Sequence, residues 1–154
     1  MTNSPLQHGA WIAICDGSRA LLVENKGDHV YPKLETHSHY TQENPSAHEQ
    51  GSAQPGRAVN SVGGRRSAME ETDYHEQAEQ AFLRNFAIQV ARAVDEHRIT
   101  NLHLIAPPRA LHVMREALPA SVRRVLASEI DRDYVKLPLH EVERHLLALE
   151  QKRK

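Results

Sequence analysis

Short hydrophobic runs open the chain and predict a small antiparallel sheet. Residues 11–15 (WIAIC) are continuously apolar, a pattern typical of a strand buried on both faces. Asp16 and Gly17 then mark a turn, and residues 20–24 (ALLVE) form a second apolar run, so a hairpin is expected. Residues 33–40 alternate in polarity and predict a third, more exposed strand. This part of the chain is therefore expected to form a three-stranded meander.

A helical period replaces this pattern after residue 66. Two sequences typical of helix starts, Ser67-x-x-Glu70 and Asp73-x-x-Glu76, mark alternative first turns. Beyond them, apolar residues recur at spacings of three and four and form one stripe that should lie on the sheet: Ala78, Phe82, Leu83, Phe86, Ala87, Val90 and Val94. We therefore expect one long amphipathic helix here.

Strands and helices alternate over the rest of the chain. The predicted elements are a strand at 102–106, a helix at 109–118, a short helical turn at 120–124, a strand at 125–130 and a helix at 139–149. A continued helix is the alternative for the fourth of these regions, but a crossover unit needs a second parallel strand. The order β-β-β-α-β-α-β-α predicts an α/β fold, with a mixed sheet covered by helices, of Rossmann-like or ribonuclease H-like shape. We expect a single domain over residues 1–154.

Residues 41–66 have no periodicity and separate the two halves. They contain two prolines and four glycines, with few large apolar residues. Loops of this length inside a compact domain are usually functional or disordered. We therefore expect a long mobile loop that is ordered by a partner or by a second subunit.

Composition narrows the class of protein without naming a function. The net charge is -1 at neutral pH, so overall charge gives no attraction to nucleic acid or to anionic membranes. The single cysteine, Cys15, excludes an intramolecular disulfide and is expected to be a small buried hydrophobe. Neither a membrane-spanning run nor a signal peptide is visible in the sequence, so a cytoplasmic location is expected.

The first candidate site is a loop rich in glycine and arginine. Adjacent glycines allow a ligand to approach the backbone, and adjacent arginines offer forked donors to phosphate or carboxylate. The spacing is not that of a nucleotide-binding P-loop. The alternative is structural, with the arginines paired to the acidic run at 70–73. The candidate residues for an anionic partner are Arg57, Gly63, Gly64, Arg65, Arg66 and Ser67.

A second candidate combines Asp16 with Arg109. Asp16 follows the first strand, and Arg109 opens a helix after a strand that is expected to be its neighbour. Ligands of open α/β sheets gather at the carboxyl ends of such strands, and a helix N-terminus with an arginine suits an anion. The alternative is a hairpin aspartate and a solvated arginine.

The histidines give weaker candidates. His75 with Asp73 is the most plausible acid–base pair, although an ordinary helix-surface histidine is the simpler interpretation. His37 and His39 would share one face of a strand and could hold a metal, but the sequence shows no third ligand. We therefore expect no metal and no cofactor.

Several motifs together resemble the bacterial host attachment protein family, described as proteins required for attachment to host cells. The matching stretches are 16–20 (DGSRA), 42–45 (QENP), 55–57 (PGR), 61–67 (SVGGRRS), 70–76 (EETDYHE), 106–109 (APPR), 129–133 (EIDRD) and 141–146 (EVERHL). More remotely, the chain is similar to domains of archaeal and eukaryotic peptide-chain release factors, which implies the α/β sheet described above. Release factors use a Gly-Gly-Gln loop, whereas Arg65 follows the glycines here. The resemblance therefore does not imply peptidyl-tRNA hydrolysis.

Two functions of different classes follow. The first is a non-enzymatic binding or adaptor domain whose loop at 56–67 engages an anionic partner, RNA or the ribosome by analogy with release factors. The alternative is a small phosphoester or ester hydrolase that uses Asp73 and His75 with Arg65 and Arg66. A role in surface attachment, taken from the family resemblance, would be indirect. No convincing nucleophile is present in the sequence, which favours the binding domain.

Overall fold

The protein is built on one mixed five-stranded sheet. The computed structural model describes residues 4–42 and 68–152, with side chains in the second range from Glu71 on. The strand order is β3-β2-β1-β4-β5, in which the first three strands are antiparallel neighbours and β1, β4 and β5 are parallel neighbours. The strands are β1 (Trp11–Cys15), β2 (Arg19–Asn25), β3 (Leu34–Thr41), β4 (Leu102–Ala106) and β5 (Leu126–Asp131).

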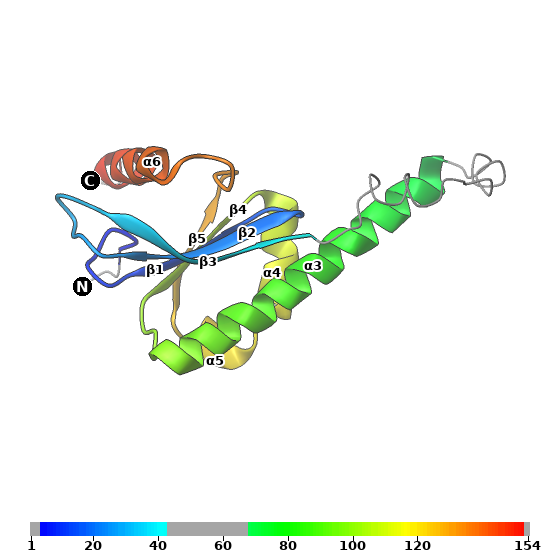
Figure 1. Cartoon of the computed structure of the whole chain (residues 1–154), viewed down its shortest axis with the longest axis horizontal. Helices are drawn as coiled ribbons and strands as arrows, with labels where there is room; N and C mark the ends of the chain where they lie inside the picture. The colour runs from blue at the N-terminus through cyan, green and yellow to red at the C-terminus, as the bar shows by residue number, and fades with distance from the viewer. Residues whose placement is uncertain (1–3, 43–67, 153–154) are drawn as a thin grey trace.

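Helices cover both faces of this sheet (Figure 1). The helices are α3 (Ala68–His97), α4 (Pro108–Ala117), α5 (Ala120–Arg123) and α6 (Leu139–Lys152). One buried cluster joins the sheet to α3, α4 and α5, and a second joins its other face to α6. Every residue of β1 and of β4 is buried, as expected for central strands covered on both sides. The predicted α/β class is confirmed.

The predicted elements are confirmed with small shifts at their ends. β5 is a strand because it pairs in parallel with β4, so the alternative of a continued helix is wrong. α6 runs to Lys152, beyond the predicted end at 149. α3 begins at Ala68, which selects the earlier of the two predicted helix starts. The long loop predicted at 41–66 lies outside the described residues, apart from Thr41, which ends β3, and Gln42.

The two halves of α3 differ in their surroundings. Its 30 residues give a length of about 45 Å, and Figure 1 shows that its first turns project past the sheet. Residues 71–81 include no buried side chain. Burial begins at Phe82 and continues at Leu83, Phe86 and Val90, which are all at most 9% exposed. The C-terminal half therefore anchors the helix, and the N-terminal half extends from it.

Asn25 joins the N-terminal segment to the turn between β2 and β3. Its side chain is fully buried, and its Nδ2 donates to the Leu6 carbonyl at 2.7 Å. Its Oδ1 accepts from the backbone N–H groups of Gly27 at 2.9 Å and Lys33 at 3.0 Å. The buried amide is thus satisfied at both ends, and it fixes the start of the hairpin.

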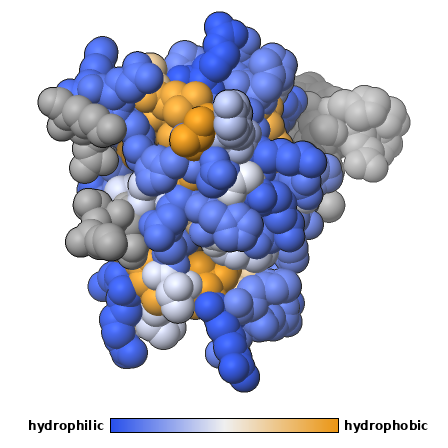
Figure 2. All heavy atoms as spheres, turned by 90° about the vertical axis from the view of Figure 1, so that its left-hand side faces the viewer, coloured by the Kyte–Doolittle hydropathy of each residue, from blue (hydrophilic) through white to orange (hydrophobic). Residues whose placement is uncertain are grey.

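The surface is mainly polar. Figure 2 shows, on the side toward the β2–β3 turn and α6, separate hydrophobic areas within a hydrophilic surface. Large apolar side chains that are exposed among the described residues are Val30, Tyr31, Tyr74 and Ile88. Within that same part of the chain, no helix has the length and apolar character needed to cross a membrane.

Candidate functional site

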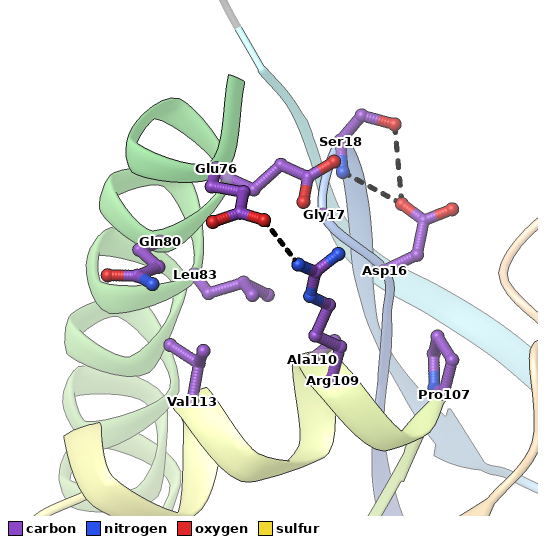
Figure 3. A pocket seen from close by; sticks show the side chains of 11 residues that line it. Asp16, Gly17, Ser18, Glu76, Gln80, Leu83, Pro107, Arg109, Ala110 and Val113 are labelled. Carbon is purple, nitrogen blue, oxygen red and sulfur yellow. Dashed lines mark hydrogen bonds and ion pairs between the residues drawn. The ribbon is translucent and has the colours of Figure 1, made fainter. Parts of the chain in front are cut away.

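A crevice lies at the carboxyl ends of β1 and β4, beside α3 and α4. These two strands are parallel neighbours, but the chain leaves β1 toward β2 and leaves β4 toward α4, so the topology switches direction here. Ligands of open α/β sheets gather at such points. The crevice has a volume of about 340 Å³. Its apolar wall comes from Leu83, Ala110 and Val113, and its polar side chains come from the β1–β2 turn, α3 and α4 (Figure 3).

Asp16 organises the turn that forms one rim of the crevice. Its Oδ1 accepts from the backbone N–H of Ser18 at 2.9 Å and of Arg19 at 2.8 Å, while the Ser18 hydroxyl lies 3.4 Å away. These bonds close the short connection between β1 and β2, as aspartate side chains do in turns. Asp16 therefore holds the rim in shape as well as contributing negative charge.

Arg109 forms the opposite rim and is already paired. Its Nη2 donates to Glu76 Oε2 at 2.6 Å, although the two side chains are 69% and 40% exposed (Figure 3). Pro107 caps α4 without a side-chain hydrogen bond, and Pro107, Arg109 and Ala110 all line the crevice. The uncapped first turn of α4 is thus part of the wall and supplies positive potential there.

Carboxylates outnumber cations in this crevice. Asp16, Glu76 and Glu79 line it together with Arg109, so three acids face one guanidinium. The Glu79 side chain covers Gly17, where an added Cβ would lie 2.7 Å from Glu79 Cδ. An anion that enters must therefore displace Glu76 from Arg109 or use the remaining N–H groups of the guanidinium.

Cys15 ends β1 beside the crevice but is not suited to chemistry. The side chain is fully buried, and burial, with a smaller effect of the neighbouring Asp16 charge, raises the pKa of its thiol far above the usual range. The thiol stays protonated, and a protonated, buried thiol is a poor nucleophile. The burial agrees with its predicted role as a small hydrophobe.

The structure brings together one pair of the predicted site residues. Asp16 and Arg109 line the same crevice, as their positions after neighbouring strands predicted. Asp73 and His75 are exposed on α3 and do not line it. They stand two positions apart on a helix, so their side chains point in different directions. The other candidates lie outside the described residues: Arg57, Gly63, Gly64, Arg65, Arg66 and Ser67.

The acidic side of the crevice was not predicted from the sequence. The sequence pattern placed Glu76 in a helix-start motif, and it gave Glu79 no role. Both lie at helical spacing from Leu83, which lines the crevice too, so they extend the inward face of α3 by one to two turns. That continuity is the signal that could have identified them.

His37 and His39 do not share a face of β3. Leu22 pairs with Ser38 and Val23 with Thr36, so a bulge leaves His37 without a partner residue and breaks the alternation. The His37 ring packs 5.1 Å from Trp11 and 4.8 Å from His97, between centroids. His39 pairs instead with Leu21. Among the described residues, no group of three or more metal-ligating side chains is present.

Comparison with known proteins gives one family. The model of a family described as bacterial archaeo-eukaryotic release factor family 12 matches residues 9–146, which is most of the chain. No curated protein matches. The match supports the predicted similarity to release factors, whereas nothing in the comparisons supports host attachment.

Proposed function

Because the chain belongs to bacterial archaeo-eukaryotic release factor family 12, we propose that it is a translation-related binding domain whose partner is RNA or the ribosome. The family match is the observation that carries this proposal, since it covers the sheet and, among the described residues, α3, α4, α5 and the first half of α6. In this role the domain acts as an adaptor, and the binding to its partner involves no catalytic step. A ribosomal partner also implies a cytoplasmic location.

The contact surface that we propose is the α3–α4 end of the molecule. Arg109 stands at the uncapped start of α4, where the helix dipole and the guanidinium both favour a phosphate. Glu76 competes for the same guanidinium and therefore weakens anion binding. The partner gains Arg109 only when it offers a better acceptor than this half-exposed carboxylate.

The segment before α3 extends this surface in the proposal. Residues 56–67 carry Arg57, Arg65 and Arg66, and α3 begins directly after them at Ala68. Further along the same helix, Glu79 and Leu83 line the crevice. The arginines are thus tethered to the helix that forms one wall of the site. Several weak phosphate contacts would then act together, as they do in other RNA-binding proteins.

The hydrolase alternative has less support from the described residues. A general base must lie within hydrogen-bond reach of the group that it deprotonates, either directly or through one water. Asp73 and His75 are exposed and lie away from the crevice, and their positions on α3 turn their side chains apart. The binding domain is therefore the function that we put forward.

Binding to purified ribosomes and to single-stranded RNA at low salt tests the proposal. Wild-type protein should co-sediment with ribosomes, and R65A/R66A and R109A should each weaken binding. E76Q should strengthen it, because Arg109 loses its internal competitor. R144A is the matched control: Arg144 is 70% exposed and pairs with Glu141 on α6, the helix on the opposite face. Equal losses for R144A and R109A, or no binding by wild type, would refute the proposed surface.

A further inference from the structure

A buried histidine on the α6 face of the sheet holds a serine on the edge strand. His103 lies in β4, is fully buried, and pairs in register with Ser128 of β5. Its Nδ1 lies 2.6 Å from Ser128 Oγ, and its Nε2 lies 2.7 Å from Asn101 Oδ1. The three side chains form a continuous chain of short hydrogen bonds.

A β-bulge creates this pairing. Leu102 pairs with Leu126, but His103 pairs with Ser128, so Ala127 is the extra residue of β5. Without the bulge, Ala127 would stand opposite His103 and the imidazole would face a methyl group. Bulges re-aim side chains and are common next to active sites. Here the bulge aims a hydroxyl at an imidazole.

The partners fix which nitrogen of His103 carries the proton. Asn101 Nδ2 donates to the Ser4 carbonyl at 3.2 Å, so the amide oxygen of Asn101 faces Nε2. A carbonyl oxygen accepts only, and therefore Nε2 carries the hydrogen. Burial lowers the pKa of His103 to about 4, so the ring is neutral at physiological pH. Nδ1 then presents a lone pair, and the Ser128 hydroxyl must donate to it.

Ser128 also lines a cavity between β5 and α6. The cavity has a volume of about 260 Å³. Ile130, Leu146 and Leu149 provide apolar lining, and the charged side chains at its edge are two of each sign: Arg132, Lys152, Glu129 and Glu150. β5 is an edge strand of the described sheet, so alternate backbone N–H groups along its outer side have no strand neighbour. Ser128 thus lies between the buried His103 and a cavity with apolar walls and a charged edge, on a strand that offers unpaired backbone donors.

We propose that Ser128 is a nucleophile, with His103 as its general base and Asn101 as a positioning residue, and that it takes the acyl group of an activated carboxylic ester whose acyl chain fills this cavity. The Ser128 hydroxyl lies at Nδ1 of His103, and the Asn101 amide oxygen lies at Nε2. His103 can therefore receive the Ser128 proton on Nδ1 without a rotation of the ring. Edge-strand N–H groups are the donors available to the developing oxyanion. This activity is independent of the binding function above.

The reaction proceeds in two steps. Ser128 Oγ bonds to the carbonyl carbon while its proton passes to His103 Nδ1, and the bond from that carbon to the alcohol oxygen breaks. The departing alkoxide takes the proton from Nδ1 and leaves as the alcohol. Water then attacks the acyl-serine, its proton passes through Nδ1 to Ser128 Oγ, and the carboxylic acid is released.

A fluorophosphonate probe on the full-length protein tests this proposal. Intact mass should show one adduct, and peptide mapping of the wild type should place it on Ser128, whatever the stability of any variant. S128A should abolish labelling, because the oxygen that forms the adduct is removed. S121A, at an exposed serine of α5, should label as wild type does. An adduct elsewhere, or none, overturns the proposal.

The pH profile separates the positioning role of Asn101 from a structural one. Labelling of the wild type should reach half its maximal rate near pH 4, where the buried imidazole loses its proton. N101D should move this midpoint upward, because a carboxylate at Nε2 favours the imidazolium. Chain-length dependence of p-nitrophenyl ester hydrolysis, with a maximum for chains that the cavity accommodates, should be lost in S128A. An unchanged midpoint in N101D contradicts the assigned role.

Discussion

Two side-chain hydrogen bonds of equal length, one in the open crevice and one in the protein interior, differ in what they contribute to stability. Arg109 meets Glu76 at 2.6 Å, and His103 meets Ser128 at 2.6 Å. The first pair stands in water, where screening and side-chain entropy leave it weak. The second involves a fully buried ring, where solvent cannot replace a missing partner. Distance alone therefore does not rank the strengths of these interactions. Only the exposed Arg109–Glu76 pair can be replaced by contacts with a binding partner.

Removal of the buried Asn25 amide should have the largest effect on stability. N25A leaves the Leu6 carbonyl and the N–H groups of Gly27 and Lys33 without their partner. We expect the free energy of unfolding to fall by roughly 4 kcal/mol: the buried Leu6 carbonyl left unsatisfied costs roughly 1–3 kcal/mol, and the lost bonds to the N–H groups of the half-buried Gly27 and the exposed Lys33 cost roughly 1 kcal/mol each. Urea denaturation followed by circular dichroism measures this. N85A, at an exposed position of α3, is the control and should stay within about 0.5 kcal/mol of wild type.

Burial of His103 should make the free energy of unfolding depend on pH. Burial lowers the pKa of His103 from 6.5 to about 4 in the folded protein, so between these values the unfolded chain binds a proton that the folded chain does not. Stability should therefore be lost as pH falls from 6.5 to 4, by about 3 kcal/mol for this group. The difference in unfolding free energy between wild type and H103Q, measured at each pH, isolates the effect. A difference that does not vary with pH over this range would show that His103 is not buried as described.

In the crevice, a smaller effect on stability is expected. R109A removes an ion pair whose partners are 69% and 40% exposed, so the free energy of unfolding should change by less than about 1 kcal/mol. E76Q should change it as little. The same two variants are predicted to shift ribosome binding in opposite directions. A stability loss of several kcal/mol in R109A would mean that the pair is structural and that binding data for this variant need another explanation.

The smallest change is expected at Gly17. An added Cβ there would lie 2.7 Å from Glu79 Cδ, but this atom belongs to the flexible end of a side chain that can move aside. G17A should therefore alter stability by less than about 0.5 kcal/mol, since alanine also restricts the unfolded chain. In contrast, an added Cβ at Gly27 would lie 2.1 Å from the Tyr31 carbonyl oxygen, which is backbone. Thermal unfolding of the two variants measures this: G27A should lower the melting temperature far more than G17A does. Similar melting temperatures for the two variants would contradict this comparison.

The hydrophobic periodicity predicted the strands and helices because the pattern of each one is contained in residues that are adjacent in the sequence. The runs at β1 and β4 and the stripe on α3 are local patterns, and their predicted strands and helix are present. Asp16 and Arg109 were found to share a site by a topological rule, since each follows the carboxyl end of a parallel strand. That rule needs the order of elements and no detail of packing.

The features that could not be predicted from the sequence depend on interactions between residues far apart in the chain. Glu76 meets Arg109 across 33 positions, and this requires the packing of α3 on α4. The bulge at His37 and the bulge at Ala127 are set by pairing with another strand, so neither the separation of His37 from His39 nor the pairing of His103 with Ser128 could be predicted from spacing. The predicted arginine loop lies outside the described residues and stays a prediction.

The salt dependence of ribosome or RNA binding tests the central proposal most directly. We predict that the logarithm of the association constant for wild type falls linearly with the logarithm of salt concentration, as released counterions require. R65A/R66A should make this slope shallower by about 0.7 for each phosphate that the variant no longer neutralises, whereas R144A should leave it unchanged. Binding that is absent at low salt, or a slope that is identical in wild type and in R65A/R66A, would contradict the proposal.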